Sequence, residues 1–118
     1  MVIGGVRLLN DFVDRKQSDL AMVAWTESLV PPGARLLTFG PTLTFSHSSR
    51  IPTFDLYDVP VEELRRPAPT YLLVDVANLD QQWSTQRPGE LYRTLRDGPG
   101  LVPLGTFGAF SLFRVESV

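Results

Sequence analysis

Two short apolar runs constrain most strongly what this chain can fold into. The first covers residues 35–39 and lies between Gly33 and Gly40, and the second covers residues 71–76. Runs of this length and composition are typical of strands that are buried on both faces of a parallel sheet. Because parallel neighbours need a crossover connection, the helical patterns between these runs predict an α/β fold.

The remaining patterns extend these two runs to a predicted five-stranded sheet. Residues 53–57 alternate as an edge strand does, and residues 101–107 and 110–115 flank a two-residue turn that suits a hairpin. With short helices between the strands, the sequence indicates a three-layer α/β domain with a mostly parallel sheet. We expect the strand order 2-1-3-4-5, in which the two most apolar strands are neighbours and only the last strand, in the C-terminal hairpin, is antiparallel.

The whole chain, residues 1–118, is predicted to form a single α/β domain. Residues 18–29 place apolar side chains at the spacing of one helix face, and the prolines and glycine at residues 31–33 end that helix. A charged stretch interrupts the apolar stripe farther upstream. Residues 1–17 are therefore predicted to be a juxtamembrane or linker helix.

Charge and composition exclude several classes of function. The net charge is −2 with acidic and basic residues interspersed, which gives no electrostatic basis for binding nucleic acid. The chain contains no cysteine, which excludes disulfides and thiol nucleophiles. No run reaches the roughly 18 apolar residues that span a bilayer. No cofactor is expected, because no cofactor-binding motif is present.

The most suitable place for a ligand is the crevice where the predicted strand order reverses, beyond the carboxyl ends of the first and third strands. Gly40 and Thr42 follow the first of these strands, and Asp75 and Asn78 follow the third. A small polar or anionic ligand would bind there at a helix N-terminus. The alternative is structural, with Gly40 in a turn and with Thr42 and Asn78 capping helices. We favour this alternative because a single glycine is no phosphate-binding fingerprint.

His47 is the only histidine in the chain. Ser46, Ser48 and Ser49 lie beside it, but neighbours on one short helix do not produce the geometry of a catalytic triad. We therefore expect no catalytic residue, and we retain His47 only as a further candidate for ligand binding.

An acidic cluster follows the predicted edge strand and suggests a divalent cation. Its members are Asp55, Asp58, Glu62 and Glu63. Their spacing matches no metal-binding loop, and acidic residues are favourable at the start of a helix. The sequence therefore predicts no metal site.

Three stretches give the chain a resemblance to a known family. They are residues 34–40 with Thr42, Leu43, Thr44 and His47, residues 69–75, and residues 104–108 with 110–115. These stretches resemble the C-terminal soluble domain of bacterial multi-spanning membrane glycosyltransferases, similar to glycosyltransferase family 39, the dolichyl-phosphate-mannose–protein mannosyltransferase type. The resemblance implies that sugar transfer is carried by acidic residues in loops between membrane helices, and none of those residues corresponds to a position in this chain.

The resemblance implies a non-catalytic extracytoplasmic accessory domain on the outer face of the cytoplasmic membrane, which assists the positioning of an acceptor, a lipid-linked donor or a partner. The expected partner is the membrane-spanning part of the same parent chain. A glycan or lipid-linked sugar is a further candidate, and nucleic acid is not expected. From the residues alone two other hypotheses stay open. They are a free-standing small-ligand-binding or regulatory α/β domain that uses the crevice, and a small hydrolase around His47.

Overall fold

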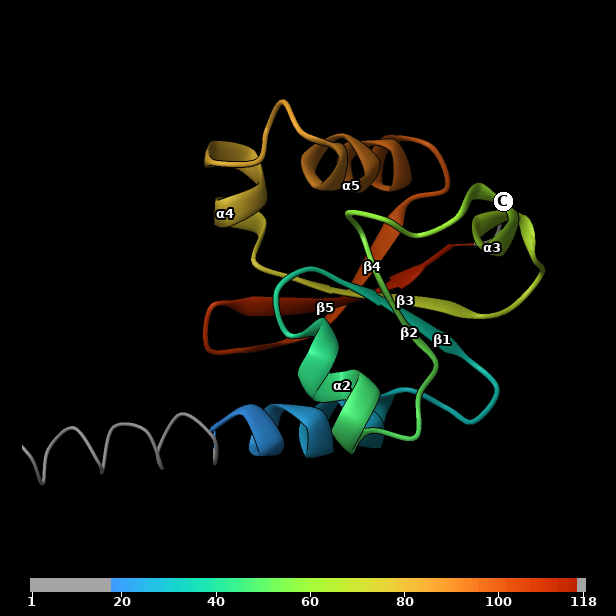
Figure 1. Cartoon of the computed structure of the whole chain (residues 1–118), viewed down its shortest axis with the longest axis vertical. Helices are drawn as coiled ribbons and strands as arrows, with labels where there is room; N and C mark the ends of the chain where they lie inside the picture. Colours follow the sequence, from blue (N-terminus) through green and yellow to red (C-terminus); the bar gives the residue numbers. More distant parts are fainter. Residues whose placement is uncertain (1–17, 117–118) are drawn as a thin grey trace, which may run out of the picture.

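The computed structural model describes residues 18–116 of the chain (Figure 1). Its first helix spans residues 18–29, as the apolar spacing predicts, whereas the helix predicted for residues 1–17 lies outside the described part. The elements that follow are β1 (Arg35–Thr38), α2 (Thr42–Ser48), β2 (Thr53–Asp55), α3 (Val61–Arg65), β3 (Thr70–Val74), α4 (Val76–Gln81), α5 (Arg87–Asp97), β4 (Leu101–Phe107) and β5 (Phe110–Val115). None of the helices in this part has both the length and the apolar composition to cross a bilayer.

The sheet is mixed, and its strand order is β2-β1-β3-β5-β4, which corrects the predicted order 2-1-3-4-5. β1 pairs in parallel with both β2 and β3, so the two most apolar strands are neighbours, as predicted. β5 lies between β3 and β4 and is antiparallel to both. Parallel and antiparallel pairings are therefore equally frequent in this sheet, and the prediction of a mostly parallel sheet was wrong.

The composition of the two hairpin strands explains why β5 is the inner one. β4 contains Pro103, which has no N–H for a second ladder, and the β4 register shifts between Pro103 and Gly105. β5 has neither proline nor glycine, and its Leu112 is fully buried. Because a proline-containing strand is tolerated at a sheet edge, the hairpin places β4 outermost.

Alternating side chains of the central strands supply two hydrophobic clusters, one on each face of the sheet. Leu36 belongs to the cluster that also includes residues of the first helix and α2, and Leu37 belongs to the cluster that includes residues of α4 and α5. In β3, Tyr71 and Leu73 face the first cluster and Leu72 faces the second. Helices therefore cover both faces of the sheet (Figure 1), and the predicted α/β class is confirmed.

Arg35, the first residue of β1, is buried and ties the sheet to α3. Its guanidinium donates hydrogen bonds to the backbone carbonyl oxygens of Glu63 and Leu64 and to the Thr70 hydroxyl oxygen. It also lies 3.4 Å from the Glu63 carboxylate, which forms a closer ion pair of 2.6 Å with Arg66. Every polar atom of the buried Arg35 side chain is therefore satisfied in this part of the structure.

Three further arginines join segments in the same way, by donating to backbone carbonyl oxygens. The contacts are those of Arg50 with Glu27 and Val30, Arg87 with Tyr57 and Val59, and Arg93 with Ser84. We call these, with the contacts of Arg35, the arginine–carbonyl contacts. A guanidinium carries several donors in a fixed fork, and three of these four side chains, all except Arg93, reach two carbonyl groups each.

Candidate functional site

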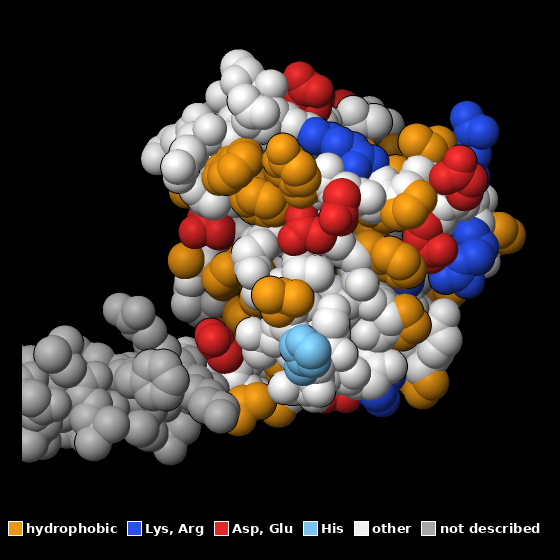
Figure 2. Space-filling model, viewed as in Figure 1, with side chains coloured by type: hydrophobic (Ala, Val, Ile, Leu, Met, Phe, Trp, Pro, Cys, Tyr) orange, Lys and Arg blue, Asp and Glu red, His pale blue; other side chains and the backbone are white. Residues whose placement is uncertain are grey.

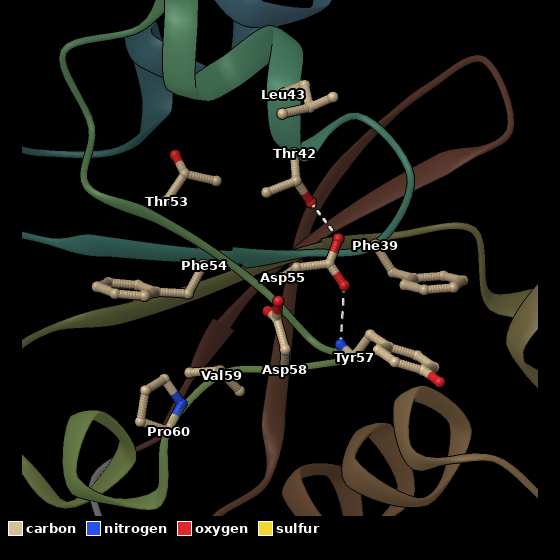
Figure 3. Close-up of a pocket in the computed structure, with 10 residues that line it drawn as sticks. All are labelled: Phe39, Thr42, Leu43, Thr53, Phe54, Asp55, Tyr57, Asp58, Val59 and Pro60. Carbon is tan, nitrogen blue, oxygen red and sulfur yellow. Dashed lines mark hydrogen bonds between the residues drawn. The ribbon is translucent and has the colours of Figure 1, made fainter.

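An open groove of about 490 Å³ follows the β2 edge of the sheet, between α2 and the loop that leads to α3 (Figure 3). Its lining residues are Phe39, Thr42, Leu43, Thr53, Phe54, Asp55, Tyr57, Asp58, Val59 and Pro60. All three residues of β2 belong to this set, because β2 is the outermost strand at this end of the sheet. The groove therefore lies at the carboxyl ends of β1 and β2, where parallel strands commonly present their functional residues.

Asp55 organises the centre of the groove. One carboxylate oxygen accepts a hydrogen bond of 2.5 Å from the Thr42 hydroxyl, and the other accepts one of 2.8 Å from the Tyr57 backbone N–H. The Thr42 contact places a negative charge beside the first turn of α2, where an anionic ligand was considered from the sequence. The protein's own carboxylate therefore disfavours an anion at this place.

Aromatic rings support one side of the groove. The Trp83 ring packs edge-on against Phe39, with ring centroids 4.8 Å apart, and against Tyr57, with centroids 6.4 Å apart. Such edge-to-face arrangements are favourable because the ring edge is positive and the ring face negative. Tyr57 nevertheless remains 57% exposed, so its side chain presents an apolar surface to solvent at the rim.

Arg87 fixes the loop that closes the groove on the α3 side. Its guanidinium donates to the Tyr57 carbonyl oxygen at 2.7 Å and to the Val59 carbonyl oxygen. Because Arg87 is the first residue of α5, these hydrogen bonds anchor the loop to the helix layer on that face of the sheet. Arg87 thus positions the groove without lining it.

The structure separates the five candidate residues predicted from the sequence. Thr42 lines the groove, whereas Gly40, Asp75, Asn78 and His47 do not. Gly40 has a φ of 110° in the turn after β1, a conformation that favours glycine. His47 lies exposed in the last turn of α2, and Figure 2 shows it on the surface, away from the acidic side chains near the centre of that face. Ligand binding by the four residues outside the groove stays a prediction.

Asp75, rather than Asn78, caps α4. The Asp75 carboxylate accepts a hydrogen bond of 3.2 Å from the backbone N–H of Asn78, and the helix begins at Val76. The prediction that Asn78 is the N-cap was therefore wrong by three residues. The physical reason is that the strand ends one residue before Asp75, whose short side chain then reaches the third N–H of the helix.

We expect the substitution Asp75→Ala to lower the free energy of unfolding by about 1 kcal/mol, the usual cost of losing an N-cap. Asn78→Ala is the control, because Asn78 contributes its backbone N–H, which the substitution retains. Urea unfolding of both variants measures the difference. A larger loss of stability in Asn78→Ala than in Asp75→Ala would contradict this assignment of the cap.

The structure also divides the acidic cluster that the sequence shows. Asp55 and Asp58 line the groove, whereas Glu63 faces Arg35 and Arg66. Hydrogen bonding from Arg66, with a smaller contribution from Arg35, holds the pKa of the Glu63 carboxyl below its ordinary value. Within residues 18–116, no three histidine, aspartate or glutamate side chains come together as metal ligands.

The groove itself was not predicted, because its residues come from segments that no motif connects. Phe39, Leu43 and Tyr57 are ordinary apolar residues in the sequence, and only the position of β2 at the sheet edge brings them together. The available signal was the brevity of the predicted strand at residues 53–57, which indicates an edge strand. An edge strand next to a helix N-terminus and an acidic loop is a combination that indicates an accessible polar surface.

Comparison with known proteins does not assign the chain to a family. No family model, no curated protein and no solved structure matches the chain. The resemblance to family 39 glycosyltransferases therefore stays a prediction.

Proposed function

We propose that this chain is a non-catalytic extracytoplasmic accessory domain of a bacterial membrane glycosyltransferase-like protein. In this role the groove beside β2 assists the positioning of an acceptor, a lipid-linked donor or a partner next to the membrane-spanning part. The observation that carries the proposal is the groove's combination of hydrogen-bond acceptors and exposed apolar surface without an activated nucleophile. Such a surface is suited to binding rather than to bond cleavage.

The arrangement of the polar groups supports a non-catalytic role. Both carboxylate oxygens of Asp55 accept hydrogen bonds from the protein's own Thr42 and Tyr57, so the groove itself holds this carboxylate in place. His47 does not line the groove. The groove does hold one hydroxyl–carboxylate pair, Thr42 with Asp55, but its lining has no histidine, lysine or arginine to stabilise the negative charge that develops in nucleophilic catalysis.

The charge of the groove favours the acceptor or a partner over the phosphate of a lipid-linked donor. Asp55 and Asp58 are the ionisable carboxylates in its lining, and the lining contains no lysine, arginine or histidine. Phosphate groups are normally held by cationic side chains or by free backbone N–H groups. We therefore place the donor phosphate outside this groove.

The first test is enzymatic. The purified chain is expected to hydrolyse no nitrophenyl ester, phosphate or glycoside above the rate of a His47→Ala variant, because no histidine or cationic side chain accompanies the Thr42–Asp55 pair in the groove lining. The measurement is the release of nitrophenolate at neutral pH. Turnover that His47→Ala abolishes would contradict the proposal and favour a hydrolase.

The second test addresses the membrane context. The coding sequence directly before Met1 is expected to specify several membrane spans, and transfer by that membrane protein is expected to fall when Leu43 in the groove is replaced by aspartate. The exposed Leu29→Asp substitution, away from the groove, is the control. A preceding sequence without spans would overturn the accessory role.

A further inference from the structure

Within residues 18–116, the outer edge of β2 offers unpaired backbone groups to the groove. The Leu36 N–H donates to the Pro52 carbonyl, and the Leu56 N–H donates to the Thr38 carbonyl, so alternate residues of this segment point toward β1. Because backbone groups of successive strand residues point to opposite sides, Thr53 and Asp55 direct theirs to the outer edge. The Asp55 carbonyl accepts from the turn that follows, which leaves the Thr53 N–H and C=O and the Asp55 N–H facing the groove.

Exposed apolar side chains border this edge. Leu43 is 74% exposed and Tyr57 is 57% exposed, and both line the groove. Val61, at the start of α3 just after the lining residue Pro60, is 51% exposed. Figure 2 shows hydrophobic side chains next to acidic ones on the face that carries this edge. Apolar side chains grouped beside an open strand edge are typical of a surface that receives another chain.

The acidic charge of the groove favours a polypeptide that carries a cationic side chain. Figure 3 shows the Asp55 and Asp58 carboxyl groups in the middle of the lining residues, with α2 on one side and the loop before α3 on the other. The Asp58 side chain is exposed, and no basic residue belongs to the lining. A cationic side chain placed here would be attracted electrostatically by both the Asp55 and the Asp58 carboxylates.

We propose that the groove binds an extended polypeptide segment that adds to the free edge of β2 and carries an arginine or lysine between apolar residues. Its backbone pairs with Thr53 and with the Asp55 N–H, and its cationic side chain lies near Asp55 and Asp58. The apolar side chains on either side of the cationic one point to the other face of the sheet, toward Phe54 and Tyr57. Strand addition of this kind takes its affinity from main-chain hydrogen bonds and its specificity from side-chain contacts. The inference rests on the proposed function in that it names the partner of the same groove as a polypeptide.

The opposite edge of the sheet is a poorer acceptor. β4 contains Pro103, which lacks an N–H, and its register shifts between Pro103 and Gly105. Both features interrupt a regular ladder and are common protections of an edge strand. The β4 edge therefore serves as an internal negative control.

The test is an NMR titration of the ¹⁵N-labelled 118-residue chain with an acetylated and amidated pentapeptide, threonine–valine–arginine–valine–threonine. We expect chemical-shift changes at the amides of Leu43, Thr53, Asp55 and Tyr57, and slower hydrogen exchange at Thr53 and Asp55. The Asp58→Asn variant is expected to weaken binding by about five-fold, the effect of one exposed ion pair. The exposed Asp80→Asn substitution in α4 makes the same change of charge away from the groove and is expected to leave binding unchanged.

Two altered peptides make the outcome decisive. A version with glutamate in place of arginine, and a version with N-methylated valines, are both expected to lose binding. Equal binding by either one, shifts at the β4 edge instead, or no shifts at millimolar peptide would overturn the proposal. Shifts of the same amides by choline chloride or lactose, without peptide binding, would assign the groove to a small molecule and also overturn it. If the coding sequence before Met1 specifies no membrane spans, the proposed function is contradicted. The chemical-shift changes caused by the peptide are expected in that case too, so the two failures can be told apart.

Discussion

Replacing Gly89 by alanine is expected to lower the free energy of unfolding by about 3 kcal/mol, the upper part of the range for overpacking a tight site. The same change elsewhere in a helix usually stabilises a protein by about 1 kcal/mol. Gly89 lies buried in the first turn of α5. A methyl group there would overlap the Trp83 carbonyl oxygen and approach the Leu79 carbonyl oxygen to 3.0 Å. Both are backbone atoms, so the loop between α4 and α5 would have to move.

Thermal unfolding followed by circular dichroism measures this effect. For a domain of this size a loss of 3 kcal/mol corresponds to a fall in Tm of about 12 °C or more. The neighbouring substitution Glu90→Ala is the control, because Glu90 is exposed in the same helical turn and should change Tm little. An unchanged or raised Tm in Gly89→Ala would show that α5 does not lie this close to the end of α4.

The substitution Arg35→Met is expected to cost about 3 kcal/mol, at the lower end of the range for breaking a buried charged contact. Methionine fills a similar volume but donates no hydrogen bond. The carbonyl oxygens of Glu63 and Leu64 and the Thr70 hydroxyl would each lose the donor they now have. A buried acceptor without a partner carries the full cost of its desolvation.

Arg66→Met is the matched control for this experiment. Arg66 forms the shorter ion pair with the same Glu63, but its side chain is 52% exposed. An exposed pair of this kind contributes little to stability, because water and salt screen it. Urea unfolding is therefore expected to show a much larger loss for Arg35→Met than for Arg66→Met. Equal losses would mean that the Glu63 ion pair, rather than the carbonyl contacts, gives Arg35 its effect.

The sequence predicted the elements of the fold better than their arrangement. The apolar runs identified β1 and β3 and their adjacency, because a strand buried on both faces needs continuous apolar side chains. The hairpin was also found, since its turn requires the positive φ of 59° that Gly108 adopts. The order of the hairpin strands was missed. This order depends on the pairing of β3 with β5, which are distant in the sequence. Its local sign is Pro103 in β4, a residue that is tolerated at a sheet edge.

The candidate site shows the same division between local and long-range information. Thr42 was predicted as a ligand residue from its place after β1, and it does line a groove. Its partner Asp55, however, belongs to β2 on the outer side of β1, whereas the predicted crevice lies between β1 and β3. A helix N-terminus adjoins strands on both sides of its own, and the spacing of residues does not reveal which side holds an opening.

The arginine–carbonyl contacts have a consequence for how this fold changes in evolution. Each contact ends on a main-chain oxygen, so the contact itself places no requirement on the side chain of the accepting residue. Substitutions at Val30, Leu64 or Tyr57 therefore require no matching change at the arginine, and covariation between paired positions would not reveal these contacts. Lysine carries a single donor head instead of a fork and does not reproduce them. Among related sequences, arginines retained opposite variable positions would mark this fold more clearly than any conserved pair.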